Sequence, residues 1–272
     1  MNATNVSKVG IGLTLSALAL CGVLVVSSSC AGSGGSGGSA GSGQGGGGGQ
    51  GGGGGGGGST AASCNAGPDE ICFANNKASG LMTGYGWVAL GAADTITSPV
   101  CDNTANGGGA SEQITKAAPC PESGGKTVWS STSGLCLTGS IPVVTGGDYT
   151  GNWGVQIGWN SSDPAGTTMG KGGYSKVTFT FNASAVTPTN TAIRGEIHRK
   201  GDPDDGNYCA TLTSGTAASL TAFNTKCWDS SGTNLTADDL PNIDKMGIQI
   251  SSDATNAYQV NNFCITDVTF SQ

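Results

Sequence analysis

The sequence predicts an all-β protein, an antiparallel β-sandwich of the jelly-roll type stabilised by disulfides. After residue 60, short runs of alternating apolar and polar residues recur between polar turns, which is typical of strands. No long segment there has the 3.6-residue period of an amphipathic helix. That part of the chain also holds an even number of cysteines, which favours disulfides in an exported protein. They are Cys64, Cys72, Cys101, Cys120, Cys136, Cys209, Cys227 and Cys264.

Residues 1–30 have the pattern of a secretory leader. Lys8 is their only charge, residues 9–26 are almost wholly apolar, and small serines precede Cys30. The segment resembles a bacterial lipoprotein leader, which implies lipid attachment at Cys30. Cleavage followed by secretion and retention as a membrane anchor are the alternatives. We therefore expect an exported protein, either secreted or anchored as a lipoprotein on an outer or cell-surface membrane.

Residues 31–60 are nearly all glycine and serine. Such a segment has no side chains to bury and a large backbone entropy, so we expect a disordered linker. Thirty residues of this kind span roughly 30 Å, which would hold a folded head clear of a membrane. Residues 61–272 are then expected to form one β-sandwich domain.

Charge and composition exclude several partners. The formal net charge is −7 and only 11% of the residues are charged, so no basic patch is available for nucleic acid. The acidic balance also argues against direct adhesion to anionic lipids. We expect contact with a membrane only through the leader or an N-terminal lipid. The surface must be covered mainly by Ser, Thr, Asn and Gly, as in many extracellular β proteins.

The first predicted strands lie at 81–90 and 135–138, and Tyr85 and Trp87 are expected to pack into the sandwich. The strand at 149–160 is expected near the middle of the fold. Its two faces differ, because side chains alternate along a strand. One face carries Trp153, Val155, Ile157 and Trp159, and the other carries Asn152, Gly154, Gln156, Gly158 and Asn160. We expect the first face in the core and the second to form a shallow groove.

Later strands are predicted at 176–182, 191–200, 208–212, 245–251 and 263–270, and one helical turn at 235–243. In the strand at 191–200, isoleucines are expected to face inward and polar residues outward. The expected outward residues of that strand and of 245–251 are Arg194, Glu196, His198 and Gln249.

The cysteines show no C-x-x-C spacing and the chain has one histidine, so a zinc cluster is not expected. Eight cysteines allow about 105 pairings. Cys209–Cys227 is the first predicted disulfide, because the two residues flank one loop-like segment. Cys136–Cys264 is the second, if the strands that carry them are neighbours.

Five segments, at 153–158, 193–198, 223–228, 246–250 and 263–268, resemble the galactose-binding-like jelly rolls of bacterial carbohydrate-binding modules. The resemblance covers roughly residues 135–270 and rests on the texture and order of the strands. It implies binding of a polysaccharide or glycan without catalysis. It also implies a structural Ca²⁺ held partly by Asp267 of the last strand; no other cofactor is expected.

If the strands at 149–160, 191–200 and 245–251 share a sheet, their outward side chains would line one surface. Amides, a carboxylate and a guanidinium suit pairs of sugar hydroxyls, and an aromatic ring suits the C–H side of a sugar. The predicted ligand-binding residues are Gln156, Asn160, Arg194, Glu196, His198 and Gln249, with Tyr149, Trp159 or Trp228 as the aromatic. The alternative is a solvated face with cross-strand hydrogen bonds only.

The sequence thus favours a tethered, non-catalytic carbohydrate-binding module. A structural or adhesive surface protein without a small-ligand site is the alternative. A glycan hydrolase using Glu196 is a further alternative, although glycosidases usually need two carboxylates and no second glutamate lies in a predicted strand. No nucleophile motif accompanies His198, so a Ser–His–Asp arrangement is not expected.

Overall fold

The computed structural model describes residues 64–121, 124–149, 151–161, 168–203, 205–229 and 231–272. The expected leader, the linker and Cys30 lie outside these residues. Within them, no helix has the length and apolar character needed to cross a membrane.

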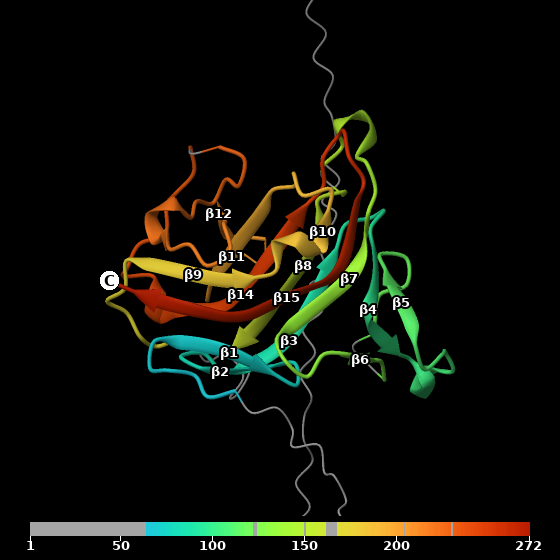
Figure 1. Ribbon diagram of the computed structural model, residues 1–272, viewed down its shortest axis with the longest axis horizontal. Helices are drawn as coiled ribbons and strands as arrows, with labels where there is room; N and C mark the ends of the chain where they lie inside the picture. Colours follow the sequence, from blue (N-terminus) through green and yellow to red (C-terminus); the bar gives the residue numbers. More distant parts are fainter. Residues whose placement is uncertain (1–63, 122–123, 150, 162–167, 204, 230) are drawn as a thin grey trace, which may run out of the picture.

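The protein is all-β and every strand pairing is antiparallel, as the sequence predicts (Figure 1). The strands are β1 (Glu70–Ala74), β2 (Lys77–Gly80), β3 (Gly84–Leu90), β4 (Thr95–Asp102), β5 (Glu112–Thr115), β6 (Lys126–Val128), β7 (Leu135–Ile141), β8 (Gly154–Ser161), β9 (Lys176–Phe181), β10 (Val186–Thr187), β11 (Ile193–Arg199), β12 (Tyr208–Thr211), β13 (Ala218–Ser219), β14 (Ile243–Ser251) and β15 (Tyr258–Ser271). Between them, the described residues contain only 3-10 turns and no α-helix.

One hydrogen-bonded path connects most strands, in the order β12-β11-β14-β8-β3-β2-β1-β15-β7-β4-β5. Strands β9 and β10 also pair with β15, β13 pairs with β9, and β6 pairs with β4. In Figure 1, β9, β15 and β7 pass in front of β11, β14, β8 and β3, while β1 and β2 lie beside both groups. The jelly-roll arrangement stays a prediction, because this continuous path does not divide the strands into two separate sheets.

The apolar face of β8 lies in the core, as expected. Val155, Ile157 and Trp159 have no exposed surface. The Trp159 ring packs edge-on against Phe73 of β1 at 4.7 Å and tilted against Phe179 of β9 at 6.5 Å between centroids. These contacts join strands from both groups, so one apolar core lies between them.

The expected strand at 149–160 is shorter in the structure. β8 begins at Gly154, whose φ of +106° is readily adopted only by glycine. Trp153 therefore precedes the regular alternation and is half-buried, so its expected place in the core is wrong. The expected helical turn at 235–243 is limited to a 3-10 turn at Leu240–Asn242, after which Ile243 begins β14.

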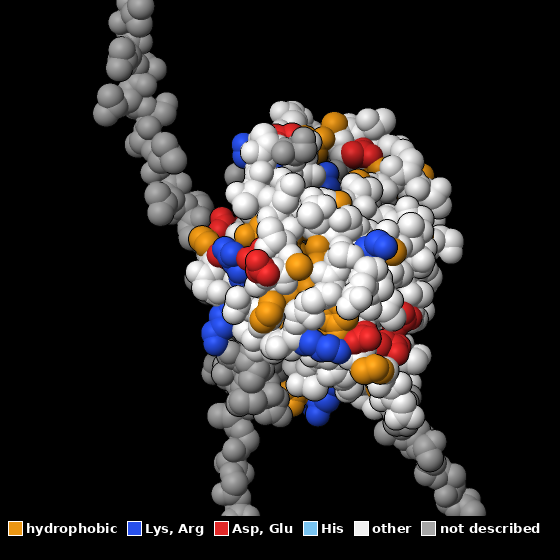
Figure 2. All heavy atoms as spheres, turned by 90° about the vertical axis from the view of Figure 1, so that its left-hand side faces the viewer, with side chains coloured by type: hydrophobic (Ala, Val, Ile, Leu, Met, Phe, Trp, Pro, Cys, Tyr) orange, Lys and Arg blue, Asp and Glu red, His pale blue; other side chains and the backbone are white. Residues whose placement is uncertain are grey.

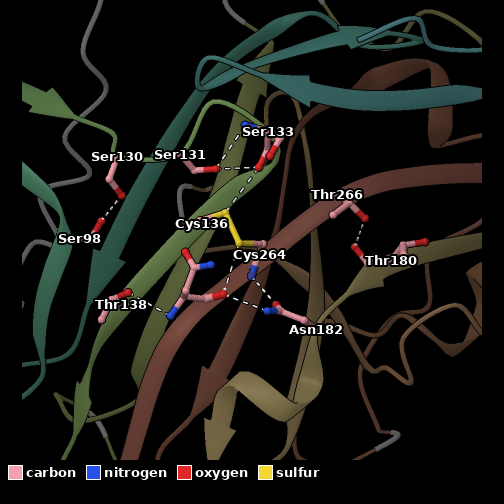
Figure 3. Close-up of a disulfide and its surroundings, with 11 residues drawn as sticks. Ser98, Ser130, Ser131, Ser133, Cys136, Thr138, Thr180, Asn182, Cys264 and Thr266 are labelled. Carbon is pink, nitrogen blue, oxygen red and sulfur yellow. Dashed lines mark hydrogen bonds between the residues drawn. A yellow bond between two sulfur atoms is a disulfide. The ribbon is translucent and has the colours of Figure 1, made fainter. Parts of the chain in front are cut away.

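Both predicted disulfides are confirmed. Cys136 of β7 and Cys264 of β15 are directly opposed in the ladder, with their Cα atoms 4.1 Å apart (Figure 3). Cys209–Cys227 joins β12 to the loop that follows the 3-10 turn Leu220–Ala222. The other four described cysteines form Cys64–Cys72 and Cys101–Cys120.

The surface has few charged groups, in keeping with the composition. The end of the molecule shown in Figure 2 is covered mostly by uncharged side chains and backbone, with scattered basic groups and a few small groups of acidic side chains. One acidic cluster surrounds Arg199, which donates to Asp202 and Asp239 at 2.9 Å and 2.7 Å.

Candidate functional site: a polar face across four strands

Strands β11, β14, β8 and β3 lie side by side, and their ladders fix which residues share a row. Arg194 opposes Gln249, which opposes Gln156. In the next row Glu196 opposes Gly247, Gly247 opposes Gly158, and Gly158 opposes Trp87. In the third row are His198, Lys245, Asn160 and Tyr85. The predicted convergence of the three strands is therefore confirmed. We call this outer surface the amide face and define it by Gln156, Asn160, Arg194, Glu196, Gln249 and Trp87.

Glu196 is the centre of the hydrogen bonding on the amide face. Its Oε2 accepts a hydrogen bond of 2.6 Å from Nε2 of Gln156 and one of 3.2 Å from Nδ2 of Asn207. The residue is only 7% exposed. Burial raises the pKa of Glu196 to about 7, although the Gln156 hydrogen bond and the Arg194 charge act in the opposite direction.

Gly158 makes room for Trp87 in the row of Glu196. A Cβ added at Gly158 would lie 2.6 Å from Cζ2 of Trp87 and 2.4 Å from the backbone oxygen of Met246. The indole therefore lies against bare backbone at Gly158. Any larger residue at this position would push the ring away from the sheet.

Gln249 connects Arg194 to the chain that leads into β8. Its Oε1 accepts a hydrogen bond of 3.5 Å from Nη1 of Arg194, and its Nε2 donates to the backbone oxygen of Trp153 at 3.1 Å. Burial lowers the pKa of Arg194, while the Glu196 charge raises it. Gln249 is buried, whereas Arg194 and Gln156 are half-buried, so the buried side chains hold the outer ones in place.

Three polar atoms on the amide face are buried and have no hydrogen-bond partner among the residues that the structure describes. They are Nε1 of Trp87, Oδ1 of Asn160 and Nε of Arg194; among the described side chains a fourth such atom, Nε1 of Trp159, belongs to the core. A buried polar atom without a partner costs roughly 1–3 kcal/mol. Two donors and one acceptor on one surface thus leave hydrogen-bonding capacity for another molecule.

His198 lies in the same rows but is not available to a ligand. It is 3% exposed, and its Nδ1 and Nε2 lie 2.6 Å from Oδ1 of Asp244 and 3.1 Å from the oxygen of Pro203. Both partners accept hydrogen bonds, so the ring must carry both protons. Burial lowers the pKa of His198, but the hydrogen bond and charge of Asp244 together raise it above its usual value. The prediction that His198 contacts a ligand is wrong, because it fastens the loop after β11.

The predicted aromatic residues are not on the amide face. Trp159 has no exposed surface and belongs to the core, so its expected role is wrong. Tyr149 is exposed but precedes β8, outside the rows. Trp228 is exposed beside a different pocket, at the edge of β12.

The sequence reasoning missed Tyr85, Trp87 and Asn207. Tyr85 is 43% exposed and Trp87 is half-buried, so the prediction that both pack into the sandwich is wrong. The alternation in 84–90 correctly places them on one face, but alternation alone does not show which face is outside. Asn207 gave no signal, because it belongs to a turn.

Asp267, the predicted calcium ligand, is held by two hydroxyls. Thr180 donates to its Oδ1 at 2.9 Å and Thr266 to its Oδ2 at 3.0 Å. In the described part of the chain, no group of three His, Cys, Asp or Glu side chains could hold a metal ion. A calcium ion at Asp267 stays a prediction.

Searches with protein-family models and against curated proteins found no match for this chain.

Proposed function

We propose that this protein is an exported, non-catalytic glycan-binding head, carried by its N-terminal leader or by a lipid at Cys30, and that the amide face binds the glycan. The observation that carries the proposal is the set of unpartnered buried polar atoms on Trp87, Asn160 and Arg194. Arg194 and Asn160 lie two strands and four residues apart in the register, so partners for all three side chains would come from successive rings of one oligosaccharide.

The residues of the amide face divide into two layers. Gln156, Asn160 and Arg194 are half-buried, and with Trp87 they form the layer that contacts the sugar. Beneath them, Glu196 and Gln249 are buried and orient the amide and guanidinium groups. Trp87 supplies an aromatic surface for the C–H side of a sugar ring, in place of the buried Trp159.

Binding without catalysis fits this arrangement better than hydrolysis. Glycosidases usually need two carboxyl groups on either side of the scissile bond. Glu196 is engaged by Gln156 and Asn207, and Asp244 is engaged by His198. A rigid adhesive head without a ligand site would not explain why the unpartnered atoms gather on this face.

The proposal is tested by glycan-array binding of the exported protein, followed by titration of the bound glycan into variants. Gln156→Ala and Trp87→Ala should each weaken binding by about 10-fold or more, since each removes about 1–3 kcal/mol of polar or aromatic contact. Thr266→Ala, an exposed substitution on β15, is the control and should bind like the unaltered protein.

Circular dichroism would confirm that each variant keeps its strands. Absence of saturable binding to any glycan, or equal binding by both variants and the control, would contradict the proposal. Release of reducing ends by the unaltered protein that disappears in Glu196→Gln would instead support the hydrolase.

A further inference from the structure

The loop that follows the 3-10 turn Leu220–Ala222 holds the most exposed aromatic side chain among the large hydrophobic residues described. Trp228 is 75% exposed. Exposure of a large apolar ring is unfavourable, at about 25 cal/mol for each Å² left in water. A ring that stays in solvent beside a pocket is therefore a candidate contact for another molecule.

The loop is held firmly at its base. Cys227, next to Trp228, is joined by its disulfide to Cys209 of β12. The backbones of Asn224 and Cys209 exchange two hydrogen bonds of 2.9 Å and 3.0 Å, and the side chains of Asn224 and Asn234 are hydrogen-bonded. The base of the loop is thus paired to the edge of β12 both covalently and through the backbone.

The tip of the loop is closed by its own polar groups. Thr225 and Thr233 exchange two hydrogen bonds of 3.0 Å, one through the backbone and one through Oγ1 of Thr225. Nζ of Lys226 donates to Oγ of Ser231 at 3.0 Å. Because Trp228 directly follows the disulfide-bonded Cys227, its exposed ring is attached to an anchored point of the chain.

A pocket of about 360 Å³ opens between this loop and the edge of β12. Trp228 lines the pocket. The polar residues that line it are Thr211, Thr221, Asn224, Lys226, Asp229 and Asn234. Hydroxyls, amides and one charge of each sign make this lining neutral overall while offering both donors and acceptors. Such a pocket beside an aromatic ring suits a neutral molecule rich in hydroxyl groups.

We propose that this pocket is a second sugar-binding site, in which a sugar ring stacks on Trp228. The inference deepens the proposed function, because it assigns the same class of ligand to a separate place. Thr211 and Cys209 of β12 oppose Arg194 and Glu196 of β11, so the pocket and the amide face are neighbours across one sheet. From β12 to β8 the distance is about 14 Å, at about 4.8 Å for each of three strand steps, which one oligosaccharide can span.

Two sites on one rigid body increase the affinity for a long glycan, because the second contact becomes intramolecular. We therefore expect a hexasaccharide to bind more tightly than the corresponding monosaccharide, and Trp228→Ala to remove that advantage. The titration uses the exported protein with cellohexaose, xylohexaose, mannohexaose and their monosaccharides. Tyr149→Ala is the matched control, because it removes another exposed aromatic ring outside both sites.

Trp228→Ala should weaken hexasaccharide binding by about 10-fold or more relative to Tyr149→Ala, and should abolish the sugar-induced shift in tryptophan fluorescence that arises from an exposed indole. Loss in Trp87→Ala with no change in Trp228→Ala would overturn the second site and leave the proposed function standing. Loss in Trp228→Ala alone would support the second site and overturn the amide face. No binding of any of these sugars would overturn the Trp228 site.

Discussion

Two surfaces of this protein are both rich in polar side chains, yet they use their polar groups differently. The first is the amide face. The second, which we call the hydroxyl face, is the outer side of β7, β9 and β15 around the Cys136–Cys264 disulfide (Figure 3). It is defined by Thr138, Thr180, Asn182, Asn262 and Thr266.

On the hydroxyl face, side chains bond mainly to nearby backbone. Oγ1 of Thr138 accepts from the backbone nitrogen of Asn262 at 3.0 Å, and Oδ1 of Asn182 accepts from that of Cys264 at 2.6 Å. The hydroxyl of Thr266 shares its one proton between Oδ2 of Asp267 at 3.0 Å and the backbone oxygen of Thr180 at 3.3 Å. The short side chains thereby repair the irregular pairing of β15, whose register shifts after Val260.

On the amide face, longer side chains bond to each other across strands, as Gln156 does with Glu196. They leave buried polar atoms on Trp87, Asn160 and Arg194 without partners. The comparison teaches that polarity alone does not mark a binding surface. What distinguishes the amide face is hydrogen-bonding capacity that the protein itself does not satisfy.

The largest expected effect is the loss of stability on removing the disulfide of the hydroxyl face. Cys136 and Cys264 are 128 residues apart in sequence, so the double substitution Cys136→Ala/Cys264→Ala releases a long loop in the unfolded chain. The chain-entropy model gives a loss of about 4–5 kcal/mol in the free energy of unfolding. Urea unfolding with linear extrapolation measures it.

The control for this substitution is Cys101→Ala/Cys120→Ala, which opens a loop of only 19 residues and should cost about 3 kcal/mol. Neither double variant should change glycan binding in its folded state, since neither disulfide lies on the amide face. A larger loss for the shorter loop would contradict the entropic explanation.

The next largest effect concerns the amide face: the free energy of unfolding should depend on pH because of Glu196. The folded-state pKa of Glu196 is about 7, above the ordinary value of 4.5. The stability it contributes is therefore complete below about pH 4.5 and is lost as the pH rises through about 7. The loss is on the order of 3 kcal/mol, at about 1.4 kcal/mol for each pKa unit. His198 acts in the same direction, because its folded-state pKa is also raised.

Glu196→Gln should flatten most of this dependence, because the amide does not ionise. Urea unfolding between about pH 4 and about pH 8 measures the difference between the two proteins. Thr266→Ala is the matched control and should keep the dependence of the unaltered protein. A protein that becomes more stable as the pH rises through 7 would show that Glu196 is ionised in the fold.

The smallest effect is expected for Thr266→Ala itself. The Thr266 side chain is exposed, and its hydroxyl has the backbone oxygen of Thr180 and Oδ2 of Asp267 as hydrogen-bond partners. Surface substitutions of this kind usually change stability by about 0.5 kcal/mol or less. Thermal unfolding would reveal it, and a loss above about 2 kcal/mol would show that hydroxyl groups on this face contribute more than local repair.

Alternation predicted much of the fold because it depends only on the geometry of a strand. Met246, Ile248 and Ile250 are buried, and Gln249 lies on the opposite face of β14, as expected. The Cys136–Cys264 disulfide followed from a similar argument about neighbouring strands.

The depth of the amide face could not be predicted in this way. Glu196 and His198 are on the expected face, but both are buried, because Asn207 and Pro203 of the loop after β11 contact them. Loop positions depend on distant contacts that periodicity does not encode. The prediction that Trp159 contacts the ligand failed for a related reason. The sequence alone does not show that Trp159 is buried and Trp87 is partly exposed.

The fold depends on its last strand, β15. β15 pairs with β1, β7, β9 and β10, and Tyr258, Phe263 and Ile265 on it are fully enclosed. A nascent chain without these residues lacks the strand that connects β1 to β7 and β9. The fold of β7 and β9 therefore depends on β15, and Cys136 cannot join Cys264 until this strand has been synthesised.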